Sequence, residues 1–220
     1  MHLKYLLMIG AALLLAGCGS DGDDRSADSR DPSISGVYSG TFPCRNCPGI
    51  DTTLWLRADG RFFIRQEIPG DLGGEATTTY NLGRWNWIPR DEIVELHGAG
   101  PARSFARADP GTLVMKTRSD LEYRLKRKRK TPEFTSTIAM SGMINLAGGS
   151  ASFTECLTGL AAPVDKVGEF SRFQRQYRRI DARGAPVFVE FDGRFNWSKG
   201  NSLKSYIIER FISVKENRTC

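Results

Sequence analysis

Two cysteines stand close together in the segment TFPCRNCPGID, residues 41–51, as Cys44-Arg-Asn-Cys47. Such a pair can act as a redox couple, contribute to a metal site or close a short loop as a disulfide. A catalytic couple needs a thiolate stabilised at a helix N-terminus, and a tight Zn²⁺ site needs four nitrogen or sulfur ligands. The pair instead lies between a strand pattern and a Pro-Gly turn, with no second Cys-x-x-Cys and no histidine nearby in the sequence. Two soft thiolates suit Cu(I), so we rank a disulfide first, a copper-responsive dithiol second and an oxidoreductase third.

The cellular compartment of these cysteines follows from the first twenty residues, MHLKYLLMIGAALLLAGCGS. The apolar stretch is too short for a finished transmembrane helix, which needs about 20 residues, but it suits a secretory signal over residues 1–17. Its end, Leu15-Ala16-Gly17-Cys18, looks like a bacterial lipobox, which predicts cleavage before Cys18 and lipidation of its thiol. Gly19 in place of aspartate resembles an outer-membrane address. In an oxidising periplasm, disulfides are the default state of paired cysteines.

Residues 18–33 contain the lipidated cysteine and a segment rich in Gly, Ser and Asp, which cannot bury enough apolar surface to fold. We interpret this segment as a flexible tether. The formal net charge of the chain is +6, and loss of the signal, with Lys4, leaves about +5. An exported lipoprotein does not routinely meet nucleic acid, so we expect no nucleic-acid partner. Lipid headgroups or an acidic protein are better candidates for this charge.

Residues 34–126 predict an antiparallel β-barrel. Apolar residues alternate in short runs, and turn signals such as Ala58-Asp59-Gly60 and Ala108-Asp109-Pro110-Gly111 separate them. A run of basic residues covers 124–130, and we interpret residues 127–136 as a solvated linker between domains. The alternative for this run is a contact with anionic headgroups, worth about 1 kcal/mol per basic residue.

Residues 137–220 predict a second, OB-like barrel with one helix. The five expected strands are 142–147, 150–156, 187–191, 194–197 and 205–214. Val167, Phe170, Phe173, Tyr177 and Ile180 follow a helical period and form a core-facing stripe. The fold class is therefore mainly β, with two domains.

Cys156 and Cys220 are the remaining cysteines, 64 positions apart in the second domain. Four available cysteines allow three pairings. Local closure and the separation of the domains favour Cys44–Cys47 together with Cys156–Cys220. We find no motif of an enzyme, since neither Gly-x-Ser-x-Gly nor His-Glu-x-x-His occurs, and we interpret His97 as an ordinary turn residue.

Several motifs together resemble the NlpE family, also called CutF. They are Gly36-Val37-Tyr38-Ser39-Gly40, the Pro43–Ile50 segment with its two cysteines, and Ser152-Phe153-Thr154-Glu155-Cys156-Leu157-Thr158-Gly159, with the Pro186-Val187-Phe188-Val189 strand and the terminal Cys220. The resemblance implies a lipocalin-like N-terminal barrel and a C-terminal OB-like domain.

The resemblance also implies a function. It implies an outer-membrane lipoprotein with its domains in the periplasm, which senses envelope stress or surface contact. It further implies signalling to the periplasmic domain of a CpxA-like kinase and a role in copper tolerance. Two alternatives are a lipocalin-like carrier of lipid or a small ligand and a purely structural lipoprotein.

Overall fold

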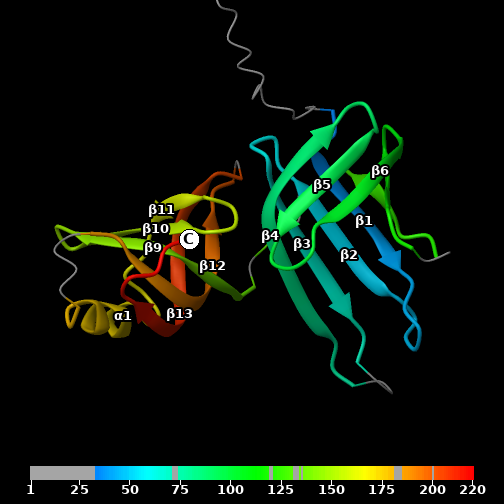
Figure 1. The fold of residues 1–220 in the computed structure, drawn as a ribbon. Coiled ribbons are helices and arrows are strands. Elements are labelled where there is room, and N and C mark those ends of the chain that lie inside the picture. Colours follow the sequence, from blue (N-terminus) through cyan, green and yellow to red (C-terminus); the bar gives the residue numbers. More distant parts are fainter. Residues whose placement is uncertain are drawn as a thin grey trace, which may run out of the picture.

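The computed structural model describes residues 33–70, 74–118, 121–130, 134, 136–180, 185–199 and 201–220. These residues form two β domains that lie side by side, with the barrel of strands β1–β8 beside the sheet of strands β9–β13 (Figure 1). The expected signal peptide, the acylated Cys18 and the tether as far as residue 32 lie outside the described residues. No helix in the described part of the chain is long and apolar enough to cross a membrane.

Eight antiparallel strands close the first domain, each hydrogen-bonded to its neighbour in sequence, and β1 pairs with β8. The strands are β1 (Gly36–Phe42), β2 (Ile50–Leu56), β3 (Arg61–Ile68), β4 (Thr77–Ile88), β5 (Ile93–Gly98), β6 (Arg103–Asp109), β7 (Thr112–Met115) and β8 (Arg124–Lys128). The predicted turn at residues 58–60 is confirmed. Gly60 there has a φ of +78°, and its N–H donates to the Arg57 carbonyl (3.1 Å).

Large side chains fill the interior of the barrel. They include Tyr38, Leu54, Leu56, Phe62, Ile64, Trp85, Trp87, Val94, Phe105, Leu113 and Leu125, each at most 5% exposed. An eight-stranded barrel is just wide enough for side chains to fill or to hold one small ligand. Here the aromatic rings occupy the interior, so the barrel is a packed core.

The basic run 124–130 is partly a strand, and the expected linker therefore starts too early. Residues 124–128 form β8, which pairs with β1 through Tyr38 and Arg127. Leu125 points into the core, and the Arg127 guanidinium lies 4.8 Å from the centroid of the Tyr38 ring. The alternation of inward and outward side chains along β8 was hidden in the sequence, because Arg127 occupies an inward position although it is charged. Arg127 lies at the end of the barrel, and its guanidinium donates to the Ser35 carbonyl in the segment that enters β1.

The second domain contains a five-stranded sheet in the order β11-β10-β9-β12-β13. Its elements are β9 (Ile138–Ala147), β10 (Ser150–Glu155), β11 (Ala161–Pro163), α1 (Phe170–Tyr177), β12 (Val187–Trp197) and β13 (Leu203–Lys215). A parallel bridge between Val164 and Tyr206 connects the two edges of the sheet. The Asp165 N–H donates to the Tyr206 carbonyl at the same place (2.8 Å).

Three details of the sequence prediction are wrong. The Asp192-Gly193 pair makes no turn, because β12 continues through it with register shifts next to both residues. A Cβ on Gly193 would lie 2.5 Å from the Ile207 carbonyl oxygen, so glycine is needed there for the close approach of β13. The short strand β11 was missed, and His97 lies within β5 rather than in a turn.

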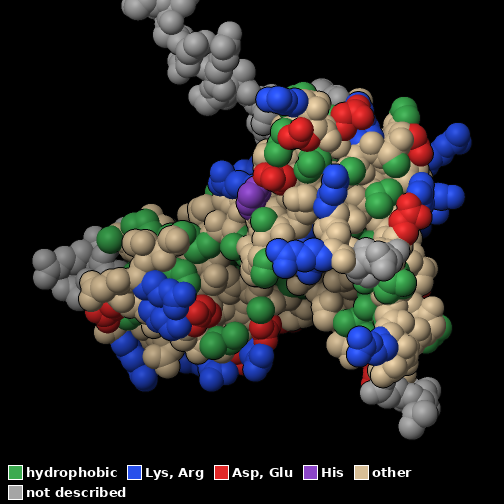
Figure 2. All heavy atoms as spheres, turned by 45° about the vertical axis from the view of Figure 1, so that its right-hand side comes forward, with side chains coloured by type: hydrophobic (Ala, Val, Ile, Leu, Met, Phe, Trp, Pro, Cys, Tyr) green, Lys and Arg blue, Asp and Glu red, His purple; other side chains and the backbone are tan. Residues whose placement is uncertain are grey.

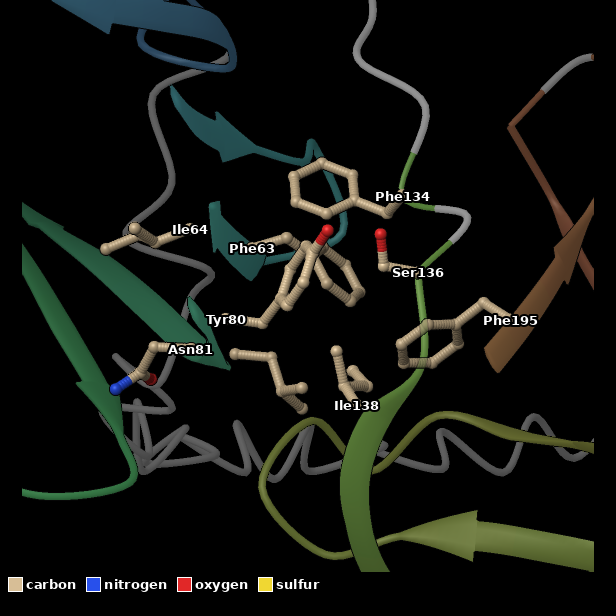
Figure 3. Close-up of a pocket in the computed structure, with 9 residues that line it drawn as sticks. Phe63, Ile64, Tyr80, Asn81, Phe134, Ser136, Ile138 and Phe195 are labelled. Carbon is tan, nitrogen blue, oxygen red and sulfur yellow. The ribbon is translucent and has the colours of Figure 1, made fainter. Parts of the chain in front are cut away.

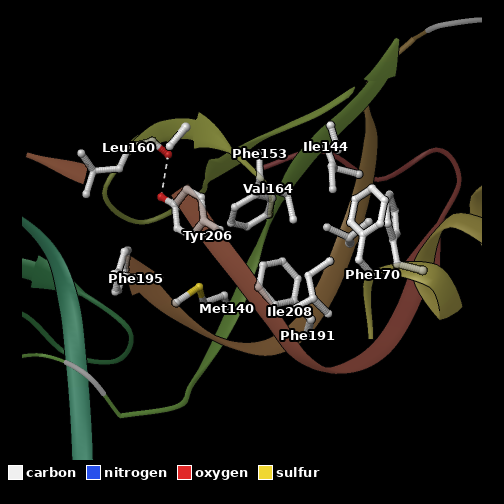
Figure 4. Close-up of a cluster of buried hydrophobic side chains, with 14 of the residues drawn as sticks. Met140, Ile144, Phe153, Leu160, Val164, Phe170, Phe191, Phe195, Tyr206 and Ile208 are labelled. Atoms are coloured by element: carbon white, nitrogen blue, oxygen red, sulfur yellow. Dashed lines mark hydrogen bonds between the residues drawn. The ribbon is translucent and has the colours of Figure 1, made fainter. Parts of the chain in front are cut away.

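The core of the second domain is rich in aromatic rings (Figure 4). The predicted helical stripe is confirmed for its central part, since Phe170, Phe173 and Tyr177 are the buried residues of α1. Its two ends are wrong, because Val167 precedes the helix and is 53% exposed, and Ile180 follows the helix and is only half-buried. Phe173 packs on Phe211 of β13, with ring centroids 6.0 Å apart. The helix lies on the side of this domain away from the barrel (Figure 1).

Candidate functional site

The Cys44–Cys47 pair lies in the loop that connects β1 to β2. The two residues form a disulfide with a Cα–Cα distance of 5.6 Å. Both are half-buried, while Arg45 and Asn46 between them are exposed. The pair therefore sits at an accessible loop tip at one end of the barrel.

Neighbouring contacts hold this loop in place. The ring of Phe42, the last residue of β1, packs edge-on against Tyr123 at 5.2 Å. The Thr41 hydroxyl donates to the Asp51 carboxylate across the two strands (2.7 Å). Gly49 has a φ of +142°, and a Cβ there would collide with the Thr41 methyl group. The loop is a fixed hairpin end, which suits a short disulfide.

Metal binding by this loop requires reduction. In the disulfide both sulfur atoms are bonded to each other, and the thiolate is the form that binds metals. The described residues contain no group of three or more His, Cys, Asp or Glu side chains that could hold a metal ion. Reduced Cys44 and Cys47 would supply two soft donors, which suits Cu(I) better than Zn²⁺.

The second disulfide joins Cys156 to Cys220, with a Cα–Cα distance of 5.3 Å. Cys156 follows β10 directly, and its N–H donates to the Ser141 carbonyl in β9 (2.9 Å). Cys220 ends the chain after β13 and is exposed. The bond therefore fixes the C-terminal tail to the turn that follows β10.

That turn is built around the buried carboxylate of Glu155, which is 1% exposed. The carboxylate accepts hydrogen bonds from the Leu157 N–H (3.1 Å), the Thr158 N–H (2.7 Å) and the Thr158 hydroxyl (2.6 Å). A buried polar group is tolerated when it is hydrogen-bonded. The Glu-Cys-Leu-Thr-Gly sequence is thus a rigid turn, with Cys156 adjacent to its central side chain.

The same turn contacts both domains. The Tyr206 hydroxyl in β13 donates to the Leu160 carbonyl (2.9 Å; Figure 4), and burial, with a further effect of Glu155, raises the pKa of Tyr206. From the barrel, the Arg61 Nε–H in β3 donates to the Thr158 carbonyl (2.9 Å). The turn that holds the Cys156–Cys220 disulfide is therefore part of the contact between the domains.

Aromatic rings make up most of this contact. Trp55 of β2 and Phe63 of β3 point outward from the barrel, away from its core. Phe134, in the segment between the domains, lies 5.8 Å from Trp55 and 5.4 Å from Phe63. Phe195 of β12 packs edge-on against Phe63 at 5.3 Å. Figure 3 shows Phe63, Phe134 and Phe195 around one small apolar pocket at this junction.

Trp197 and Arg57 complete the contact. The Trp197 ring lies 5.7 Å from both Trp55 and Phe63. The Arg57 guanidinium lies 4.8 Å from the centroid of the Trp55 ring and 5.1 Å from that of Trp197, and its Nη1 donates to the Asn201 carbonyl (2.9 Å). We call the set Trp55, Arg57, Phe63, Phe134, Phe195 and Trp197 the aromatic junction.

The carboxylate of Asp59 orients Arg57. Arg57 Nε and Nη2 donate to Asp59 at 3.0 Å and 2.8 Å, and Arg61 lies 3.3 Å from the same carboxylate. Burial raises the pKa of Asp59, but the hydrogen bond and charge of Arg57 and the charge of Arg61 outweigh it and hold that pKa below its ordinary value. Arg57 and Arg61, which both reach the second domain, are thus anchored to one hairpin turn.

The aromatic junction was missed in the sequence, although a signal is present. A strand buried on one face alternates apolar and polar residues, whereas a strand covered on both faces shows a continuous apolar run. Leu54-Trp55-Leu56 and Phe62-Phe63-Ile64 are such runs. They indicated that another element covers the outside of β2 and β3.

His97 is exposed on β5, with its Nε2 3.5 Å from Glu95 Oε2, and takes no part in either cysteine site. On the face shown in Figure 2, Lys and Arg side chains occur on both domains, and several lie next to acidic side chains. Many of the basic residues are therefore in surface ion pairs, such as Arg107–Glu92 (2.5 Å) and Arg194–Glu209 (2.5 Å).

Comparison with known proteins matches both halves of the chain to one family. The model of the NlpE N-terminal domain matches residues 38–142, and the model of the NlpE C-terminal OB domain matches residues 134–220. Lipoprotein NlpE of Escherichia coli is 28% identical over 167 residues, covering 72% of this chain and 67% of the relative. A 17 kDa lipoprotein of Treponema pallidum is 37% identical over 62 residues, covering 28% of this chain and 38% of the relative.

Among solved structures, the crystal structure of the Cpx pathway activator NlpE from Escherichia coli aligns with a TM-score of 0.33 and 22% identity. The alignment covers 84% of this chain and 97% of that one. The two family models together span residues 38–220, which includes both disulfides and the aromatic junction. The chain belongs to the NlpE family.

Proposed function

We propose that this protein is an outer-membrane lipoprotein that senses envelope stress or surface contact and signals to the periplasmic domain of a CpxA-like histidine kinase. It is anchored through acylated Cys18, its two domains face the periplasm, and it has no catalytic activity. The observation that carries the proposal is the match of both NlpE family domains within one chain. One member of this family, from Escherichia coli, is described as an activator of the Cpx pathway.

The packed interior of the first domain favours signalling over transport. A carrier would need space for an apolar ligand within the barrel. Here the rings of Tyr38, Phe62 and Phe105, each at most 2% exposed, take up that space. A partner would therefore bind to the outside of the barrel.

In this proposal the first domain signals and the second restrains it. Phe195 and Trp197 of β12 cover the outward rings of β2 and β3. Separation of the domains would uncover Trp55 and Phe63. Clusters of exposed aromatic residues and arginine are typical of protein–protein contacts, so the uncovered face suits a partner.

The Cys156–Cys220 disulfide supports this restraint. It fixes the turn at Glu155–Leu160, and Arg61 of the barrel binds the Thr158 carbonyl in that turn. Without the disulfide, the second domain loses stability and the turn loses one of its attachments. Failure to oxidise the pair would thus weaken the contact between the domains and report poor oxidation in the periplasm.

The proposal also includes a role in copper tolerance. It rests on the family resemblance and on the two soft donors that reduced Cys44 and Cys47 would provide. In the oxidised pair, the role of the loop is to close the β1–β2 hairpin.

A reporter of the envelope-stress response tests the division of labour. Cells would produce the parent, Cys220→Ser, or Trp197→Ala, which removes the largest ring of the second domain at the aromatic junction. Ile212→Ala is the matched control, because Ile212 lies on β13 of the same domain and is 49% exposed. Both test variants should raise basal output above the parent and the control, and only in cells whose kinase retains its periplasmic domain. Equal output from all four chains at equal abundance would refute the restraint.

A further inference from the structure

The last strand of the barrel, β8, and the two residues that follow it carry a group of exposed cations. Lys126, Lys128, Arg129 and Lys130 are all exposed, and within the described part of the chain none of them forms an ion pair. We call these four residues the basic strip. Lys126 acts on one acidic group, Asp109, whose pKa is lowered by hydrogen bonds from the Gly111 N–H and the Thr112 hydroxyl and, less, by the charges of Arg124 and Lys126.

The basic strip lies where the chain from the membrane anchor enters the barrel. Arg127, which lies between Lys126 and Lys128 but is not part of the strip, donates from Nη1 to the Ser35 carbonyl (2.7 Å) and from Nη2 to the Ser33 carbonyl. One residue further, Lys128 pairs with Val37 of β1. The first described residues of the chain are therefore held against the strip.

The segment between Cys18 and Ser33 limits the distance to the anchor. A segment of about 15 residues reaches at most about 50 Å when fully stretched. The end of the barrel at which the tether enters therefore stays within this distance of the bilayer. The four cations are concentrated at that end of the barrel.

We propose that the basic strip binds the anionic phospholipid headgroups of the membrane that holds the anchor. The acyl chains confine the protein to the bilayer, and the strip orients the barrel with its tether-proximal end toward it. A membrane suits these cations better than a protein cleft, because long, exposed lysine side chains meet a diffuse anionic surface with little ordering. The attraction acts within about 10 Å at 0.1 M salt.

This orientation depends on the lipid anchor of the proposed function, but the headgroup contact does not. Vesicle binding by a non-acylated chain, residues 19–220, measures the contact alone, while acylation is measured separately in cells. The two can therefore fail independently.

The test is co-sedimentation of the non-acylated chain with vesicles of phosphatidylcholine alone or with 30% phosphatidylglycerol added, ~0.1 M salt. Each basic residue near an anionic surface raises binding roughly fivefold. The variant Lys126→Gln/Lys128→Gln/Arg129→Gln/Lys130→Gln should therefore bind the anionic vesicles at least about 100-fold more weakly than the parent. The glutamines keep the length of the side chains, and a thermal melt checks that β8 still closes the barrel.

A variant with the same change in charge provides the control. Lys166→Gln/Arg175→Gln/Arg178→Gln/Arg179→Gln removes four exposed cations from and beside α1, on the side of the second domain away from the barrel. It should bind anionic vesicles nearly as the parent does. Equal losses in the two variants would show a general effect of net charge and overturn the proposal. So would parental binding by the basic-strip variant, which would leave the cations to an acidic protein partner.

Discussion

Replacement of Cys220 by serine should destabilise the second domain strongly while leaving the barrel folded. The disulfide closes a loop with a sequence separation of 64 residues. In the chain-entropy model a cross-link of this length contributes about 4 kcal/mol, because it restricts the unfolded chain. For a domain of roughly 80 residues, each kcal/mol corresponds to about 4–8 °C in Tm, so we expect a fall of roughly 20 °C.

Calorimetry of the mature chain measures this fall directly. The parent in the presence of a reductant should resemble Cys220→Ser. The matched control, Cys44→Ser/Cys47→Ser, removes a disulfide from the other domain and should leave the transition of the second domain in place.

Hydrogen exchange adds a local test, because the Leu157 and Thr158 N–H groups, which are hydrogen-bonded to Glu155, should exchange faster in Cys220→Ser. If the Tm of the second domain stays within about 3 °C of the parent, loop closure contributes little here and the reasoning fails.

Three further predictions concern single groups. Cys18→Ala should leave an unprocessed, non-acylated precursor, and incorporation of radiolabelled palmitate equal to that of the parent would contradict the lipobox. The reduced mature chain should bind one Cu(I), and Cys44→Ser/Cys47→Ser should abolish this; equal uptake in a titration would leave only the structural disulfide. Because the pKa of Asp59 is lowered from 3.8 in the folded state, its contribution to stability is present at neutral pH and is lost as the pH falls through that lowered pKa. Asp59→Asn should therefore be less stable than the parent at pH 7, with a smaller difference at pH 2–3 in urea unfolding, and a difference that does not depend on pH would contradict it.

The sequence determined the elements that depend on local patterns. Asp59 and Gly60 predicted a hairpin, because glycine adopts positive φ without strain and aspartate binds nearby N–H groups; the Asp59 carboxylate does accept from the Arg61 N–H (3.2 Å). The helical stripe of Phe170, Phe173 and Tyr177 was likewise readable, because a period of 3.6 places these rings on one face.

Local patterns failed where a neighbouring strand decides the structure. Asp192-Gly193 has the sequence of a turn, but its flanks are extended along both β9 and β13, and this backbone pairing outweighs the preference for a turn. The charges of β8 indicated a linker, yet a barrel must close, and pairing with β1 and β7 supplies the hydrogen bonds that make this segment a strand.

The two cysteine pairs show the same division. Proximity in sequence and the boundary between domains were enough to predict which cysteines pair, because a disulfide needs Cα atoms within about 7 Å. Only the tertiary structure shows that the Cys156–Cys220 disulfide holds a turn that contacts the barrel. Arg61 lies far from Thr158 in the sequence, and only the packing of Trp55 and Phe63 against the second domain brings the turn with Cys156 onto the barrel.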